Sequence, residues 1–127
     1  MGKTRLNKDI VLNFCNTDYS GTSCYVEEEL HSSYAVLQKY CNKYKLDLGS
    51  VIPIYEGPAL VLNAVVTEPG TSCSGAMLKI IVKEIKRLSK EGSVRFFQKN
   101  IHIHQKLPDK IKDYLIRKLS DFTLTFH

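Results

Sequence analysis

One motif occurs twice in the sequence, and this repeat limits the folds open to the chain. Residues 11–24 read VLNFCNTDYSGTSC, and residues 61–73 read VLNAVVTEPGTSC. Each copy has a short apolar run suited to a buried strand, a glycine that permits a tight turn, and hydroxyl side chains suited to cap a helix. The repeat therefore predicts a strand, turn and helix used twice. We interpret it as an internal β-turn-α duplication, and two independently acquired turns with good capping chemistry are the alternative.

Apolar periodicity predicts the other elements. The run ALVLNAVV is the most continuous strand signal and indicates a central strand, whereas Pro53 assigns the preceding run to an edge or a bulge. The order β-α-β-β-α-β-β-α-β predicts the α/β (α+β) class, with a mixed sheet of about six strands and three helices packed on it. We expect a ferredoxin-like core with a C-terminal β-α-β extension. The predicted strands are 9–15, 50–55, 59–66, 93–98, 101–105 and 122–126, and the predicted helices are 24–44, 74–90 and one that begins at Pro108.

Length and composition favour one globular domain. The 127 residues predict a single α/β domain over 1–127, since 43% of them are hydrophobic and 24% are charged. The sequence contains no run of eighteen apolar residues and no apolar signal core at its start. We therefore expect an intracellular, cytoplasmic protein without a membrane partner. The cysteines form no C-x-x-C pair, so we interpret them as free thiols and expect no cofactor and no metal: Cys15, Cys24, Cys41 and Cys73.

Charge is distributed unevenly along the chain. The formal net charge is +5, but residues 1–75 carry −2 and residues 76–127 carry +7. This asymmetry favours an anionic partner, nucleic acid first, and a merely solvated basic surface is the alternative. Lysines recur at helical spacing on the second predicted helix and form one basic ridge. The predicted nucleic-acid-binding residues are Lys79, Lys83, Lys86, Arg87, Lys90, Arg95 and Lys99.

The second GTSC loop is a candidate site for a phosphate or another small anion. A helix N-terminus presents free N–H groups and the positive end of the helix dipole. The first copy is followed by three glutamates, which repel an anion, whereas the second is followed by no acid until Glu84. The loop lacks the Gly-Lys-Ser/Thr ending of a P-loop, and plain helix capping is the alternative. The predicted ligand-binding residues are Gly70, Thr71, Ser72, Cys73 and Lys79.

Two patterns offer catalytic chemistry. Cys73 is predicted at a helix start, where the thiolate is favoured and can act as a nucleophile. His102 and His104 are separated by one residue, so on a strand both rings point to one face and can hold a metal ion. This His-Ile-His motif is similar to the metal motif of the replication-initiator and transposase nucleases, which cut single-stranded DNA with a tyrosine, and Tyr114 follows it. The alternative is that the neighbouring isoleucines face the core while the histidines face water or a nucleic acid.

The sequence thus predicts a small binding protein that engages an anionic partner, nucleic acid first, through its basic C-terminal half and without catalysis. Three alternatives stay open. The first is a binder of a nucleotide or small anion at the second GTSC loop, with a homodimer as one arrangement. The second is an enzyme, either a metal-dependent nuclease or a thiol enzyme. The third is an assembly protein whose exposed strands pair with another copy to form a homo-oligomer.

Overall fold

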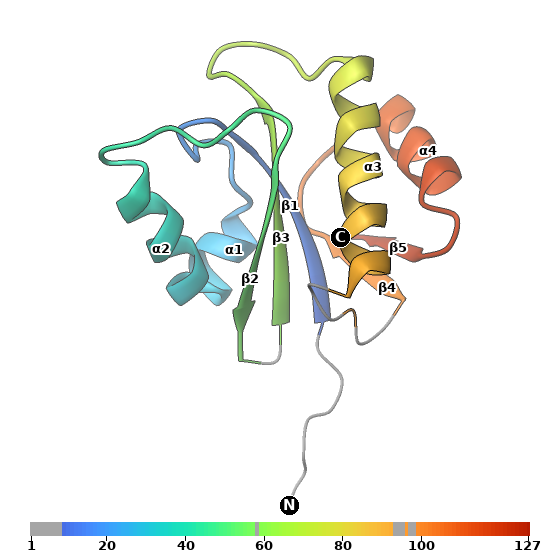
Figure 1. Cartoon of the computed structure of the whole chain (residues 1–127), viewed down its shortest axis with the longest axis horizontal. Helices are drawn as coiled ribbons and strands as arrows, with labels where there is room; N and C mark the ends of the chain where they lie inside the picture. The colour runs from blue at the N-terminus through green and yellow to red at the C-terminus, as the bar shows by residue number, and fades with distance from the viewer. Residues whose placement is uncertain (1–8, 58, 93–95, 97–98) are drawn as a thin grey trace, which may run out of the picture.

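Five strands and four helices form an α/β structure in the computed structural model, which describes residues 9–57, 59–92, 96 and 99–127 (Figure 1). The strands are β1 (Asp9–Asn16), β2 (Val51–Glu56), β3 (Ala59–Thr67), β4 (Asn100–Ile103) and β5 (Thr123–Phe126). The helices are α1 (Cys24–Glu29), α2 (His31–Tyr40), α3 (Gly75–Glu91) and α4 (Asp109–Lys118). One sheet joins the strands in the order β2-β3-β1-β4-β5. β1, β3, β4 and β5 run parallel, and the edge strand β2 is antiparallel to β3.

The two copies of the repeat lie side by side at the centre of the sheet. The Val-Leu-Asn of 11–13 pairs residue for residue with the Val-Leu-Asn of 61–63, on neighbouring parallel strands. β1 and β3 are buried along almost their whole length. A strand that is buried on both faces requires a covering layer on each side, so these two apolar runs dictate a three-layer arrangement.

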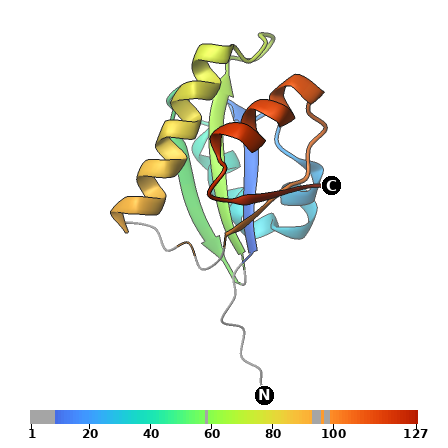
Figure 2. The ribbon, with the colours of Figure 1, turned by 90° about the vertical axis from the view of Figure 1, so that its right-hand side faces the viewer.

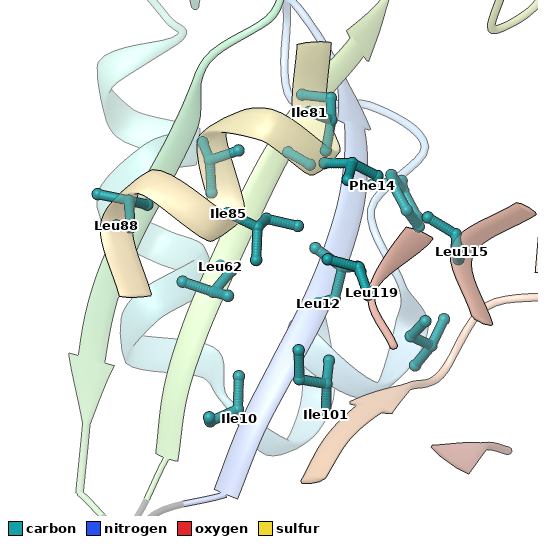
Figure 3. Close-up of a cluster of buried hydrophobic side chains, with 14 of the residues drawn as sticks. Ile10, Leu12, Phe14, Leu62, Ile81, Ile85, Leu88, Ile101, Leu115 and Leu119 are labelled. Atoms are coloured by element: carbon teal, nitrogen blue, oxygen red, sulfur yellow. The ribbon is translucent and has the colours of Figure 1, made fainter. Parts of the chain in front are cut away.

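The helices form the two outer layers. α3 and α4 cover one face of the sheet, and α1 and α2 cover the other (Figures 1 and 2). On the first face, Ile85 of α3 and Leu119, the residue that follows α4, pack on Leu12 of β1 (Figure 3). The second face has two smaller clusters, which α1 and α2 share with the opposite sides of the same strands. Each fully buried aliphatic side chain contributes about 1.5–3 kcal/mol to folding.

A buried polar network joins the two repeats beneath α1 and α2. Asn13 Nδ2 donates to Asn63 Oδ1 at 2.9 Å, and the hydroxyl of Tyr19 donates to the same oxygen at 3.0 Å. Asn63 Nδ2 donates to the carbonyl of Ile52 at 3.0 Å, and Asn13 Oδ1 accepts from the N–H of Ser23 at 3.0 Å. Both asparagines are fully buried, so their polar atoms depend on these partners. The network fixes β3 to β2, and β1 to the turn that follows it.

The α/β class and the mixed sheet are confirmed, but the ferredoxin-like core is wrong. In a ferredoxin-like core both helices lie on one face, and the last strand runs antiparallel to the first. Here α3 lies opposite α1 and α2, and β4 pairs parallel with β1. The reason is the burial of both faces of β1 and β3, which helices on a single face would leave half uncovered. The described residues hold five strands rather than six, and the strand expected at 93–98 falls largely outside them.

The helix expected over 24–44 is divided in two, so the described residues hold four helices rather than three. Leu30 ends α1 and precedes α2 with φ −121° and ψ 48°, which lie outside helical values. Its side chain is buried against Val11 and Val26. Tyr44, predicted on the same apolar stripe, follows the end of α2 and is 60% exposed. Periodicity misses this break because the buried positions on either side of it still recur at steps of three and four.

Candidate functional site

A crevice opens at the edge of the sheet where β1 and β3 end. Its volume is about 480 Å³. The chain leaves β1 toward α1 on one face of the sheet, whereas it leaves β3 and β4 toward α3 and α4 on the other. Neighbouring strands whose connections diverge in this way leave a gap at their carboxyl ends, where α/β folds bind ligands. The lining residues are Phe14, Cys15, Asn16, Gly21, Thr22, Ser23, Cys24, Val66, Thr67, His104, Gln105, Lys106 and Leu107.

The turn after β1 forms one wall of the crevice, and side chains hold it in place. Asn16 Nδ2 donates to Ser20 Oγ at 2.8 Å, and Asn16 Oδ1 accepts from the hydroxyl of Thr67. Ser23 caps α1, and its hydroxyl lies 3.2 Å from the carbonyl oxygen of His104. The wall is therefore fixed both to the end of β3 and to the segment that follows β4.

Gly21 exposes the backbone of this wall. Its φ is +77°, and a Cβ added here would lie 3.2 Å from Asn16 Nδ2. Within the described part of the chain, the N–H groups of Gly21 and Thr22 donate to no acceptor, and both residues line the crevice. The corresponding glycine of the second repeat, Gly70, also has a positive φ, +85°, but nothing lies within 4 Å of its Cβ position.

Gln105 extends the pairing of β1 with β4 beyond the last residue of β4. Its Oε1 accepts from the N–H of Phe14 at 2.9 Å. Its Nε2 donates to the carbonyl of Phe14 at 2.7 Å and to that of Gly21 at 2.9 Å. A side-chain amide can stand in for a strand residue in this way because it both accepts and donates. Gln105 therefore joins β1, the first turn and the segment after β4.

The lining suits a ligand that combines a flat part with an anionic part. Lys106 is the one Lys or Arg of the lining, which contains no carboxylate. Beside it the ring of His104 is stacked on Tyr25, with centroids 3.7 Å apart, and on His127, with centroids 4.0 Å apart. Desolvation lowers the pKa of His104, and the imidazoles of His127 and His102 lower it further. His104 is therefore neutral at pH 7 and contributes an aromatic, polar surface rather than a charge.

His102 and His104 lie on one face of the sheet, whereas Tyr114 lies on the other. Ile101 and Ile103 of β4 belong to the core that Tyr114 packs against, so the histidines between and after them point away from it. Among the residues that the structure describes, no three His, Cys, Asp or Glu side chains are grouped so as to hold a metal ion. The arrangement of the tyrosine nucleases is therefore not assembled by these side chains.

The second GTSC loop lies at the same edge of the sheet, outside the crevice lining. Gly70, Thr71 and Ser72 are exposed, and the cap of α3 is Ser74, whose Oγ accepts from the N–H of Met77 at 3.1 Å. Lys79 lies one turn into α3, beside the groove between α3 and α4. No contact of the described residues tests ligand binding at this loop, which stays a prediction.

Cys73 connects the second loop with the crevice. It borders a small cavity together with Phe14, Val66 and Leu107, which also line the crevice. Burial raises the pKa of its thiol, and a raised pKa reduces the thiolate that a nucleophile requires. All four cysteines of the chain are free.

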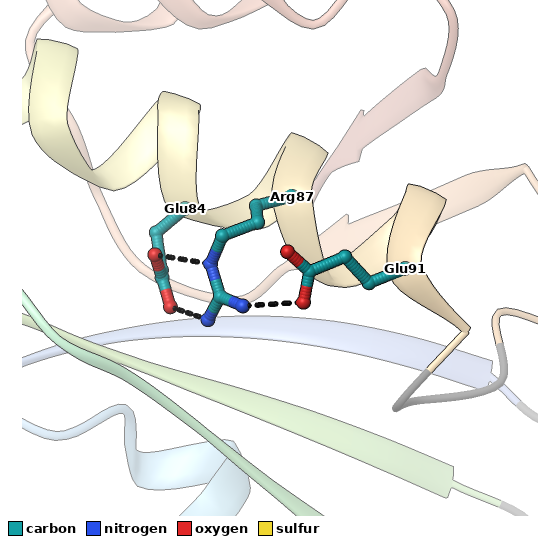
Figure 4. A network of polar contacts seen from close by, with 3 residues as sticks. All are labelled: Glu84, Arg87 and Glu91. Atoms are coloured by element: carbon teal, nitrogen blue, oxygen red, sulfur yellow. Dashed lines mark hydrogen bonds and ion pairs between the residues drawn. The ribbon is translucent and has the colours of Figure 1, made fainter.

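The predicted basic residues occupy separate environments. Arg87 lies between Glu84 and Glu91 on the outer face of α3 and pairs with both, so its charge is offset within the helix (Figure 4). Lys99 lies over the ring of Phe122, with Nζ 5.6 Å from the centroid. None of the basic residues of α3 lines the crevice. Of the remaining predicted residues, Lys79, Lys83 and Lys86 line a hollow between α3 and α4, Lys90 lies in the last turn of α3, and Arg95 lies outside the described residues.

Of the site residues predicted from the sequence, His104 lines the crevice, and sequence reasoning did not select the other lining residues. The three glutamates at 27–29 were expected to repel an anion from the first turn, which favoured the second loop as the site. In the structure α1 holds these glutamates exposed, and none of them lines the crevice. The position along the chain could have identified three of the lining residues, Asn16, Gln105 and Lys106. Each lies at or just beyond the carboxyl end of a predicted strand, where a parallel sheet gathers its ligand contacts.

Comparisons with known proteins identify the fold. No protein-family model and no curated protein matches the sequence. Among solved structures, the chain is similar to the macrodomain of Mycobacterium tuberculosis DarG, with a TM-score of 0.71 and 10% identity over 99% of this chain and 93% of that chain. The macrodomain of Thermus aquaticus DarG gives a TM-score of 0.68 and 12% identity over 98% and 93% of the two chains. A macrodomain protein from Streptomyces coelicolor gives a TM-score of 0.59 and 12% identity over 99% of this chain and 90% of that chain. The fold is macrodomain-like.

The prediction of a nucleic-acid-binding protein is wrong. The likeness to macrodomains overturns it. The electrostatic premise also fails at Arg87, which two glutamates neutralise. No helix of the described residues is both long enough and apolar enough to cross a bilayer. A homo-oligomer stays a prediction.

Proposed function

We propose that the chain binds a nucleotide-like anion of the ADP-ribose type in the crevice. Macrodomains bind ADP-ribose, whose base, ribose groups and diphosphate demand both flat and anion-binding surfaces. The observation that carries the proposal is the position of the crevice, at the carboxyl ends of β1 and β3 where the connections diverge to opposite faces. Its volume of about 480 Å³ falls within the roughly 300–1,000 Å³ of small-ligand sites.

In this proposal the diphosphate lies against the first turn. Successive backbone N–H groups in a turn with a positive φ form a concave anion site, and Gly21 and Thr22 offer two such donors. Glycine at this position lets a phosphate approach the backbone closely. Lys106 supplies a positive charge from the segment after β4, and no carboxylate of the lining opposes it.

The rest of the ligand takes the remaining crevice. Asn16 uses one N–H of its amide for Ser20, which leaves a second N–H for a ribose hydroxyl. At the other end, Phe14 and Leu107 are shared with the cavity beside Cys73. A ligand as long as ADP-ribose can extend from the first turn toward the second GTSC loop, so the two predicted turns would flank one site.

A matched pair of glycine variants tests the proposal. Gly21→Ala and Gly70→Ala each introduce a Cβ at a positive φ, so both add similar backbone strain. Only the Cβ at Gly21 meets Asn16 and narrows the crevice. Isothermal titration calorimetry with ADP-ribose should show binding that Gly21→Ala weakens by about tenfold or more, equivalent to ~1.4 kcal/mol, while Gly70→Ala changes the affinity by less than about threefold.

Lys106→Ala separates the diphosphate from the rest of the ligand. It should weaken ADP-ribose about fivefold and leave adenosine, which has no phosphate, unchanged. Far-UV circular dichroism confirms that each variant is folded. If Gly70→Ala weakens binding and Gly21→Ala does not, the ligand lies at the second loop as the sequence predicted. Absence of saturable heat for the wild type up to about 1 mM ADP-ribose would refute the proposal.

A further inference from the structure

α3 and α4 lie side by side on the face of the sheet turned away from α1 (Figure 2). Their side chains line a groove between the two helices. Two adjoining hollows of about 520 Å³ and 370 Å³ lie along it, and Tyr114 lines both. Along α3 the groove extends from Gly75 to Lys86. At 1.5 Å per helical residue this distance is roughly 16 Å, which matches about five residues of extended peptide.

The rims of the groove are basic on both sides. Six cationic side chains line it, and the one carboxylate among the lining residues belongs to Asp113. Among the described residues, Arg87 makes the ion pairs. The six cations of the groove therefore have no carboxylate partner within the described part of the chain. Like charges that line one groove repel one another, and an acidic partner would relieve that repulsion. The six are Lys79, Lys83 and Lys86 from α3, and Lys110, Arg117 and Lys118 from α4.

The floor between the rims is apolar. Val82 and Leu78 lie at its base, and Ile80 on its border is 47% exposed although it is aliphatic. Tyr114 stands at the centre, with the guanidinium of Arg117 5.7 Å from its ring centroid. Apolar surface with an aromatic centre and a charged rim is typical of a surface that binds a protein segment.

We propose that this groove binds a short acidic peptide segment in extended form, with its carboxylates on the two rims and a bulky apolar side chain beside Tyr114. The length of the groove and the apolar floor favour a peptide over a single small anion. The cations are spread over about 10 Å of α3 and about 12 Å of α4, so one phosphate reaches only a few of them. The crevice at the ends of β1 and β3 lies elsewhere, so this inference goes beyond the proposed nucleotide site.

Fluorescence anisotropy with a labelled heptapeptide tests the proposal. The peptide alternates glutamate with leucine around a central phenylalanine, and a second peptide carries glutamine in place of every glutamate. The acidic peptide should bind saturably, at least about tenfold tighter than the glutamine peptide, and should weaken as salt rises from 50 to 300 mM. The double variant Lys83→Glu with Lys118→Glu should bind about tenfold more weakly, since it reverses one charge on each rim.

Two further variants give the proposal its controls. Lys39→Glu with Lys43→Glu makes the same change of net charge at exposed positions on the α2 side, and it should alter peptide affinity by less than about twofold. Ile80→Ser keeps every charge and should weaken the peptide about threefold or more.

Three outcomes would overturn the proposal. They are no saturable binding of the acidic peptide, equal weakening by the α2 control pair, and displacement of the peptide by inorganic polyphosphate at equal charge concentration. The last two would mean general attraction to a basic protein. Added ADP-ribose should not displace the peptide, so failure of this proposal and failure of the nucleotide site are separate results.

Discussion

Gln105 provides the sharpest test of how the crevice is built. The substitution Gln105→Glu keeps the shape of the side chain and replaces its NH₂ by an oxygen. The carboxylate still accepts from the N–H of Phe14, which lies 2.9 Å from the present Oε1. Its other oxygen then faces the carbonyls of Phe14 and Gly21, which lie 2.7 Å and 2.9 Å from the present Nε2. Two attractive contacts become repulsive ones.

The size of the effect follows from these contacts. Each lost hydrogen bond removes about 0.5–1.5 kcal/mol, and the close approach of a carboxylate to two carbonyl oxygens adds a similar amount. We expect the free energy of unfolding to fall by about 2–4 kcal/mol at pH 7. At about 4 °C per kcal/mol for a domain of this size, the melting temperature falls by roughly 8–16 °C.

The defect should shrink in acid. A protonated carboxyl group again donates to a carbonyl, so the folded state favours the neutral form and raises the pKa of the introduced group above its unfolded value. The stabilisation by the neutral form is complete below the unfolded pKa and disappears as pH rises through the folded pKa. Urea unfolding, followed by the fluorescence of the tyrosines, should therefore show a smaller difference from the wild type at pH 5 than at pH 7.

Two variants complete this experiment. Gln38→Glu introduces the same charge at an exposed position of α2 and should stay within about 0.5 kcal/mol of the wild type at both pH values. Gln105→Leu removes the amide altogether and should be destabilised relative to the wild type by the same amount at pH 5 and at pH 7. Wild-type stability of Gln105→Glu at pH 7, or a difference that does not narrow at pH 5, would refute the assignment of this side chain as a clamp.

Three further predictions concern the interior and the surface. Asn63→Leu leaves the hydroxyl of Tyr19 without its acceptor, and urea unfolding should show a free energy of unfolding lower by about 3–5 kcal/mol. Adding Tyr19→Phe to this variant removes the unpaired hydroxyl and should restore about 1 kcal/mol. Folding lowers the pKa of His104, so the neutral ring stabilises the folded state. This contribution is fully present above the pKa of the unfolded state and is lost as the pH falls through the pKa of the folded state. His104→Phe should therefore lose less stability than the wild type between pH 7 and 5.5, measured as urea midpoints. Arg87→Ala removes exposed ion pairs and should lower the melting temperature by less than about 2 °C, a difference that calorimetry in 0.5 M salt should reduce further.

Local signals in the sequence were enough for the individual elements. The apolar runs of the repeat locate β1 and β3, and the helix predicted over 74–90 is observed as Gly75–Glu91 because Ser74 caps it. The division of the first helix at Leu30 could not be predicted, since it depends on the fit of that side chain between Val11 and Val26. The direction of β4 was also out of reach, because a strand signal carries no information about its partner.

The crevice was harder to predict because distant residues assemble it. Gln105 and Phe14 are 91 positions apart, and Gln105 lies outside both copies of the repeat. Their relation exists only once β4 lies parallel beside β1. The charge asymmetry, in contrast, was visible from the sequence and was misinterpreted: the cations are real, but they gather between α3 and α4 rather than at the edge where the connections diverge.

The repeat explains why one of two similar turns borders a crevice and the other does not. Asn13 and Asn63 are paired across the centre of the sheet, and each has hydrogen-bonding capacity left after that pairing. Asn13 uses it on the N–H of Ser23 and so fixes the turn after its own strand, whereas Asn63 uses it on Tyr19 and on the carbonyl of Ile52. The same residue at the same place in two copies therefore anchors a turn in one case and an edge strand in the other. Anchorage holds the backbone of the first turn in position, and such preorganisation is what the proposed anion site requires.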